Sequence, residues 1–195
     1  PARQAMDICL IAAICHVFGS RVLYLACYSN SAEGVSFLTA RGGAKFFGGY
    51  LLAFVALAAY FHFVARRIGV IRGLDLCVVP ALVAHSIMRV GCFMAGCCYG
   101  EPTDLPWGVT FSGVDEPRHP TQIYAALADA AAAFIGARVL RNASARPGDV
   151  LRFSFAFYGV FRLVLEFCWP HPNGWDASAF VNIAAALVLL AVALE

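Results

Sequence analysis

The sequence predicts an all-α fold, a polytopic bundle of transmembrane helices. Of its 195 residues, 61% are hydrophobic and 13% are charged, whereas soluble domains average about 45–50% apolar and about 25% charged residues. A single soluble core of this size could not bury so much apolar surface. The aromatic content of 13% excludes a disordered chain. The formal net charge of +2 is too small for a protein that binds nucleic acid.

Six apolar windows are long enough to cross a bilayer, whose hydrocarbon core requires about 20 helical residues. These windows are residues 6–28, 46–65, 74–98, 121–140, 150–169 and 177–194. The connections between them hold turn-forming residues, such as Pro147 followed by Gly148. No segment has the length and polarity of a linker, so we expect a single integral membrane domain over residues 1–195.

Basic residues assign the two sides of the membrane, because cytoplasmic connections carry an excess of Lys and Arg. The connection after the second window contains Arg66, Arg67 and Arg72, and the connection after the fourth window is also rich in arginine. The other connections carry acidic residues instead. Both ends of the chain are therefore expected on the cytoplasmic side, and residues 99–120 on the outer side.

The segment at about residues 91–120 is expected to be a long extracytoplasmic loop or a re-entrant segment. Residues 99–120 contain four of the nine prolines, and a loop of this length in a compact protein is usually functional. Gly91, Gly96 and Gly100 recur near Arg89, which predicts that the third helix breaks near the outer surface. Irregular backbone at membrane depth requires surrounding protein or a wet cavity.

Arg21, Arg89 and Arg162 lie in the outer halves of three different windows. An arginine at a helix centre costs about 2.5–3.5 kcal/mol on insertion scales. Each could snorkel or pair with a neighbour, as Arg162 could with Glu166 one turn later. Three arginines at one depth favour a shared cavity. Guanidinium groups bind phosphate through a planar fork of N–H donors. The sequence therefore predicts a pocket for an anionic lipid head group.

Gly48 and Gly49 belong to a glycine-rich stretch at the outer start of the second window. Glycine permits close approach of the backbone to a ligand. Small residues also permit two helices to pack closely in a membrane. Both interpretations remain open at this point.

Five segments resemble, in order, the motifs of the prolipoprotein diacylglyceryl transferase family. They are residues 19–24, 88–96, 99–108, 118–124 and 158–167. Residues 99–108 include the stretch Pro102-Thr103-Asp104-Leu105-Pro106-Trp107-Gly108, which is similar to a signature of the family. The resemblance implies seven spans in the family. We expect that the first of them precedes this chain, which starts at Pro1 without an initiator Met.

The resemblance implies an enzyme of the bacterial inner membrane, with its cavity facing the outer leaflet. Members of the family transfer a diacylglyceryl group from phosphatidylglycerol to the thiol of a lipobox cysteine in a secreted precursor, and release glycerol phosphate. The implied partners are phosphatidylglycerol, other membrane lipids, and the precursor or a related acceptor. No cofactor and no metal are expected.

The resemblance also implies roles for individual residues. Arg89 and Arg162 would hold the lipid phosphate, and Glu166 would orient Arg162. The other expected substrate contacts are Arg21, Tyr24, Gly48, Gly49, Gly91, Cys92, Gly100, Gln122 and Tyr158.

Several positions depart from the family pattern. Phe47 stands where the family has a histidine thought to activate the thiol, and phenylalanine cannot transfer a proton. Cys92 replaces an asparagine, Cys97 an acidic residue, and Ala125 a glutamate. We hypothesise that His119, at the outer mouth, replaces the missing base. These departures indicate a divergent member, whose acceptor is either a lipobox cysteine or a related group.

Cys92, Cys97 and Cys98 lie close together in the sequence near the outer face. A free cysteine most often acts as a small apolar packing residue, and we favour that role over a metal site. A structural disulfide, from Cys97 to Cys92 or Cys168, is a further alternative. Two rival functions follow: a thiol-redox membrane protein that uses these cysteines, or a non-catalytic membrane protein that binds lipid or a partner.

Overall fold

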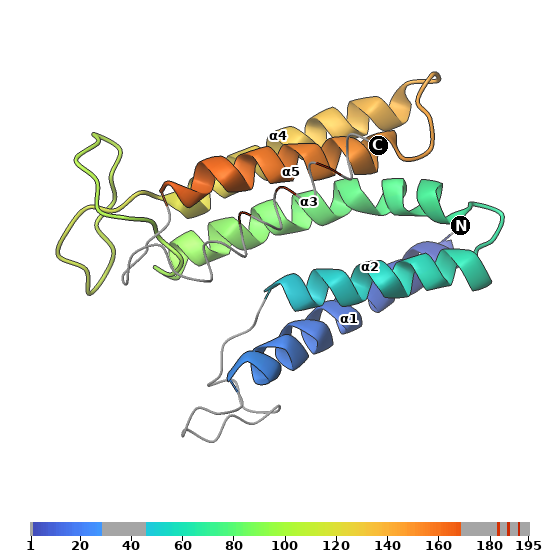
Figure 1. The fold of residues 1–195 in the computed structure, drawn as a ribbon, viewed down its shortest axis with the longest axis horizontal. Coiled ribbons are helices and arrows are strands. Elements are labelled where there is room, and N and C mark those ends of the chain that lie inside the picture. Colours follow the sequence, from blue (N-terminus) through green and yellow to red (C-terminus); the bar gives the residue numbers. More distant parts are fainter. Residues whose placement is uncertain (1, 29–45, 169–182, 184–186, 188–190, 192–195) are drawn as a thin grey trace. The chain divides into compact units, whose positions relative to one another are not determined.

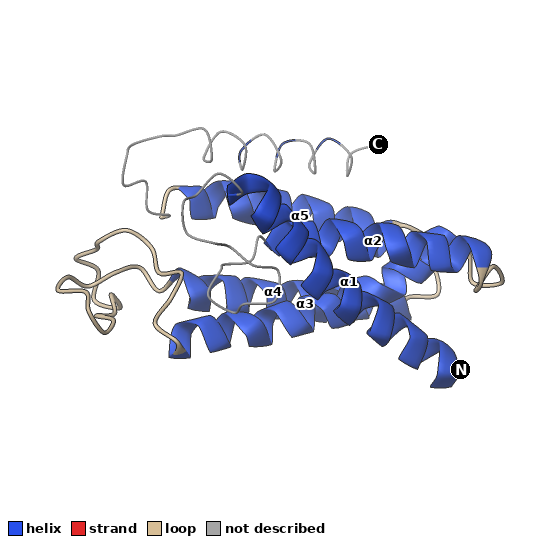
Figure 2. Cartoon of the chain, turned by 90° about the horizontal axis from the view of Figure 1, so that it is seen from below, coloured by secondary structure: helices blue, strands red, loops and turns tan. Residues whose placement is uncertain are grey.

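The protein is described by a computed structural model that covers residues 2–28, 46–168 and the helical positions 183, 187 and 191. Five helices are present in this part: α1 (Ala2–Tyr28), α2 (Phe46–Phe63), α3 (Val70–Met94), α4 (Thr121–Arg141) and α5 (Asp149–Glu166). No strand occurs among the described residues, where Pro102 and Val109 each form one isolated bridge with Arg118. The predicted all-α fold class is confirmed for this part of the chain (Figures 1 and 2).

Three helices are long and apolar enough to cross a membrane: α1 over Arg3–Leu25, all of α3 and all of α4. The apolar part of α2, Gly48–Phe63, is shorter. Helix α5 has 18 residues, of which Asp149, Arg152, Arg162 and Glu166 are charged. Six spans are therefore not confirmed by length and composition, and the sixth window lies largely outside the described residues.

The chain divides into two compact units, Pro1–Leu74 and Asp75–Glu195. In the first unit α1 and α2 run side by side (Figure 1). A Cβ atom on Gly48 would meet the carbonyl oxygen of Gly19, and one on Gly49 would meet the ring of His16. These glycines permit the close crossing of the two helices. Of the two roles left open by the sequence, their contacts with α1 are those of close helix packing. The hydroxyl of Tyr60 donates a hydrogen bond to Asp7 Oδ2 over 3.1 Å.

In the second unit α3, α4 and α5 lie beside one another (Figures 1 and 2). The Ser86 hydroxyl of α3 donates to the carbonyl of Ala126 in α4 over 2.8 Å. The carboxylate of Asp75, which is only 3% exposed, accepts hydrogen bonds from the backbone N–H groups of Gly148 at 2.6 Å and Leu151 at 2.9 Å. Asp75 of α3 therefore caps the first turn of α5, where helical N–H groups have no partner within the helix.

The third helix is shifted from its predicted window of residues 74–98, because α3 begins at Val70 and ends at Met94. The backbone after α3 turns at Gly96, with φ of 65°, and at Cys98, with φ of 63°. Both values lie in the left-handed region, which interrupts an α-helix. The predicted break after Arg89 is thus confirmed, and residues 95–120 form a long loop between α3 and α4 (Figure 1).

Candidate functional site

A chain of buried polar groups links α4 to Arg89 on α3. The Nδ1 atom of His85 lies 2.7 Å from Asp129 Oδ2, and both side chains are buried. The Nε atom of Arg89 donates to His85 Nε2 over 3.3 Å. Both contacts are satisfied by a neutral imidazole that carries its proton on Nδ1. Asp129 therefore fixes the ring of His85, and His85 orients the guanidinium of Arg89.

A second arginine is held within α5. Arg162 Nη1 lies 2.7 Å from Glu166 Oε2, four residues later on the same helix. Glu166 is only 1% exposed, so this ion pair is largely removed from water. Charge-assisted contacts of this kind fix the orientation of a guanidinium. The sequence offered this pair as one alternative from its spacing, and the structure shows it.

The two arginines share an electrostatic environment around Tyr158. Tyr158 precedes Arg162 by one turn of α5, and its side chain interacts electrostatically with Arg162, Arg89 and Asp129. Since Arg89 belongs to α3 and Asp129 to α4, charged groups from three helices act on Tyr158. A shared phosphate site for Arg89 and Arg162 stays a prediction.

The first turn of α4 holds the turn that follows α3. The Thr121 hydroxyl donates to the carbonyl of Cys98 at 2.9 Å, and Gln122 Nε2 donates to the carbonyl of Cys97 at 2.6 Å. Gln122 is completely buried, and its Oε1 atom has no hydrogen-bond partner within the described part of the chain. Gln122 was predicted as a substrate contact, and its amide nitrogen holds the start of the α3–α4 loop at Cys97.

Gly100 allows three backbone segments to meet at this point. Its N–H donates to the carbonyl of His119 at 2.8 Å, and the N–H of Glu101 donates to the carbonyl of Cys168 at 3.0 Å. A Cβ atom on Gly100 would overlap the Cys168 carbonyl oxygen and lie 2.8 Å from His119 Cβ. Only glycine fits such a close approach. By contrast, a Cβ atom on Gly91 would meet open space.

His119 belongs to a short side-chain network in the loop and the start of α4. Its Nδ1 atom lies 3.2 Å from the Tyr124 hydroxyl oxygen. The indole N–H of Trp107 donates to the same oxygen over 2.8 Å. The phenol therefore connects the imidazole to an exposed tryptophan, and its oxygen can accept from both N–H groups.

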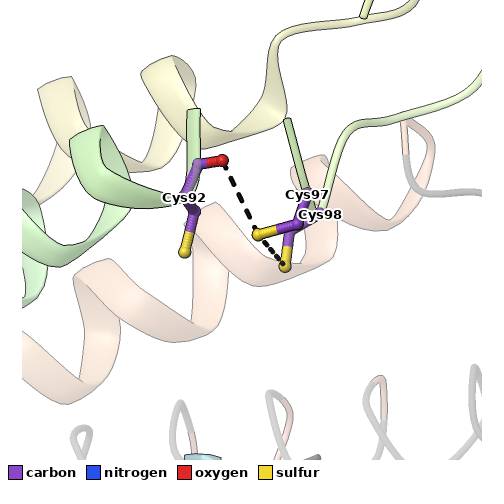
Figure 3. A group of neighbouring side chains, drawn as sticks. All are labelled: Cys92, Cys97 and Cys98. Carbon is purple, nitrogen blue, oxygen red and sulfur yellow. Dashed lines mark hydrogen bonds between the residues drawn. The ribbon is translucent and has the colours of Figure 1, made fainter. Parts of the chain in front are cut away.

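The cysteine cluster contains the side chains of Cys92, Cys97 and Cys98 (Figure 3). All three Sγ atoms lie within 4.8 Å of one another, with 3.7 Å between those of Cys97 and Cys98. Partial removal from water and the neighbouring Cys97 raise the pKa of the Cys98 thiol to about 12. Cys97 and Cys98 are exposed, and these three thiols and that of Cys168 are free. The expected packing role is therefore wrong for Cys97 and Cys98, and neither proposed disulfide is present.

Four other predicted contacts lie in the first unit, on α1 and α2. Arg21 and Tyr24 belong to α1, and Gly48 and Gly49 belong to α2. The structure describes the two units separately, so the placement of these residues beside Arg89 stays a prediction. Phe47 also belongs to α2, and its side chain is outside the described residues.

Sequence reasoning missed two functional candidates, Asp129 and Tyr124. Asp129 is the one acidic residue of the fourth window, and an isolated carboxylate in an apolar helix requires a partner. The same cost applies to Arg21, Arg89 and Arg162, so Asp129 carries an equivalent signal. Nothing in the sequence distinguishes Tyr124 from other aromatic residues, whereas its hydroxyl connects His119 and Trp107.

The fold and the site define a helical membrane protein with two anchored arginines and a polar loop at one end. The family model for prolipoprotein diacylglyceryl transferase matches residues 1–194. The chain belongs to this family, which confirms the resemblance found in the sequence.

Curated relatives agree with this assignment. The chain is 31% identical to the phosphatidylglycerol–prolipoprotein diacylglyceryl transferase of Clostridium tetani, over 93% of this chain and 76% of that protein. It is 34% identical to the Geobacter sulfurreducens protein of the same name, over 83% and 63% of the two chains. It is 37% identical to the Polynucleobacter necessarius protein of the same name, over 65% of this chain and 48% of that protein. The matched regions thus cover about half to three quarters of these relatives.

Proposed function

We propose that this chain is a membrane transferase that uses phosphatidylglycerol as its donor. The acceptor is the cysteine thiol of a prolipoprotein or a related thiol. A sulfur–carbon bond forms to the diacylglyceryl group, and the carbon–oxygen bond to the phosphate breaks. Glycerol phosphate leaves with the electron pair, and the thiol proton passes to a base. The electrostatic interaction of Tyr158 with both Arg89 and Arg162 is the observation that carries this proposal.

The two arginines stabilise the leaving phosphate. Negative charge increases on the phosphate oxygens as the carbon–oxygen bond breaks, and fixed cations stabilise that charge in the transition state. Glu166 holds Arg162 from the same helix, while Asp129 holds Arg89 through His85. These anchors reduce the reorganisation that each guanidinium would otherwise undergo during the reaction.

His119 is the proposed base in place of the family histidine that Phe47 replaces. To accept the thiol proton at Nε2, the imidazole must carry its proton on Nδ1. The hydroxyl oxygen of Tyr124, 3.2 Å from Nδ1, is placed to accept that N–H. We assign this direction to the hydrogen bond, which gives the tautomer of His119 that can act as a base.

The remaining predicted residues complete the proposed substrate cavity. Arg21, Tyr24, Gly48 and Gly49 would contribute from the first unit. Gly91, Cys92, Gly100, Gln122 and Tyr158 would contribute from the second. We place the single membrane domain in the bacterial inner membrane with the cavity open to the outer leaflet, where both phosphatidylglycerol and a secreted precursor are accessible.

Release of labelled glycerol phosphate tests this function. Full-length protein is mixed with phosphatidylglycerol labelled in the glycerol head group and with a peptide that contains a lipobox cysteine. The wild type is expected to release label only with the peptide, and R162Q to lose at least about 100-fold, since such stabilisation contributes about 2.7–4 kcal/mol. The matched control R138Q removes an exposed arginine whose guanidinium lies over the ring of Phe134 in α4.

The outcome also separates the alternatives. A wild type that binds the lipid and releases no label would support the non-catalytic lipid-binding protein instead. Full activity in R162Q would remove the phosphate-binding role from Arg162 and with it the proposed mechanism.

A further inference from the structure

The cysteine cluster lies on a turn whose backbone is held by hydrogen bonds from α4. Cys97 and Cys98 offer their carbonyl oxygens to Gln122 and Thr121 of α4. Cys98 also adopts a left-handed backbone conformation, with φ of 63°, which residues other than glycine rarely adopt. This conformation places two adjacent thiols near Cys92, on the last turns of α3 (Figure 3).

The distances between the sulfur atoms fit a single ion. Metal–thiolate bonds of about 2.3 Å place the ligand sulfurs of one ion about 3.8–4.0 Å apart. The Sγ atoms of Cys97 and Cys98 are 3.7 Å apart, and all three Sγ atoms lie within 4.8 Å. Cys97 and Cys98 are exposed, so an ion can reach the cluster from solvent.

From this geometry we propose that Cys92, Cys97 and Cys98 form a three-thiolate site for a soft d10 metal ion, Cu(I) above all. Thiolates select Cu(I) and Zn²⁺ over harder cations. Structural Zn²⁺ requires four protein ligands, and within the described part of the chain this group contains three sulfurs, with no histidine or carboxylate. Cu(I) needs no fourth ligand. Binding forms three copper–sulfur bonds and releases three thiol protons to water, without a change of oxidation state.

Occupancy of the site would alter the charge near the proposed phosphate site. Three thiolates and one Cu(I) carry a charge of −2, and Arg89 interacts electrostatically with Cys98. An anionic centre at this position competes with a phosphate for the guanidinium. Copper is therefore expected to slow diacylglyceryl transfer. This consequence rests on the proposed function, whereas the metal site rests only on the geometry of the three sulfur atoms.

The site is tested by anaerobic titration of the detergent-purified full chain with Cu(I), against a chromogenic Cu(I) chelator. We expect one tight equivalent per chain and a weakening of at least tenfold in each of C92S, C97S and C98S. C168S is the matched control, because Cys168 is a free thiol outside the cluster, and it should bind as the wild type does. Zn²⁺ is titrated in parallel and is expected to bind more weakly.

Three outcomes would overturn the proposal. In the first, the wild type takes no copper from the chelator. In the second, all three variants bind as tightly as C168S does. In the third, a thiol count on the purified metal-free protein shows two of the three cysteines joined in a disulfide. Copper that binds tightly but leaves wild-type transfer unchanged would remove only the coupling to Arg89.

Discussion

The Nδ1 atom of His85 lies 2.7 Å from the carboxylate of Asp129, and this contact joins α3 to α4 inside the bundle. His85 in turn accepts from Arg89 Nε, so the carboxylate acts on the guanidinium through the imidazole. Arg89 is thereby anchored by another helix, whereas Arg162 is anchored within its own helix by Glu166. Asp129 and His85 are positioning residues in this arrangement.

D129N is expected to slow transfer by about 10- to 100-fold, because a hydrogen bond to a charged group is worth about 1.5–3 kcal/mol. The loss should appear in kcat, since the anchor acts on an arginine that stabilises the transition state. Steady-state kinetics of glycerol phosphate release measure it. S86A, which removes another α3–α4 hydrogen bond, controls for helix packing. Equal losses in S86A and D129N would show that Asp129 is only structural.

H119A is expected to lose about 100- to 10,000-fold in transfer, the usual contribution of a general base. Binding of phosphatidylglycerol should be unchanged, because the phosphate is held by the arginines. Y124F removes the hydroxyl that lies 3.2 Å from Nδ1 and should give a smaller loss in kcat. Lipid binding and release are measured on the same preparations. An H119A variant with full activity would exclude the proposed base.

D75N is expected to destabilise the second unit by about 1–3 kcal/mol, because two backbone N–H groups at the start of α5 lose a charged acceptor. Thermal unfolding in detergent measures the change as a lower Tm. Asp149, which is more exposed and pairs with Arg152 on the same helix, provides the comparison. If D149N lowers the Tm as much as D75N does, the capping role of Asp75 is refuted.

G100A is expected to destabilise the loop, since a methyl group there overlaps the carbonyl of Cys168. G91A is the matched control, because a Cβ atom on Gly91 meets open space within α3 and alanine favours a helix by about 1 kcal/mol over glycine. The Tm should fall in G100A and stay level or rise in G91A. Proteolysis of the loop offers a second measurement. A Tm for G100A that matches the wild type would show that the loop can relax at no cost.

The sequence predicted those features that depend on local spacing. Arg162 and Glu166 lie four residues apart on a helix, and this separation alone places their side chains together. The end of α3 was also predictable in outline, because Gly96 marks a turn. The conformation of the turn after Met94 could not be predicted, because Cys97 and Cys98 are hydrogen-bonded to Gln122 and Thr121 of the next helix.

Contacts between helices could not be predicted in the same way. Spacing shows that His85 and Arg89 share a face, but it does not show which residue of α4 faces His85. That choice depends on the rotation and register of α4 against α3. The cysteine cluster could not be predicted either, because the left-handed backbone of Cys98 brings the thiols together. A prediction from composition therefore placed them among packing residues.

A double-mutant cycle on Arg89 and Arg162 tests the central claim most directly. Initial rates of glycerol phosphate release are measured for the wild type, R89Q, R162Q and the double variant. If both guanidinium groups act on one phosphate, the two losses are coupled, and the double variant loses at least tenfold less than the product of the single losses. Strictly multiplicative losses would contradict a shared phosphate site.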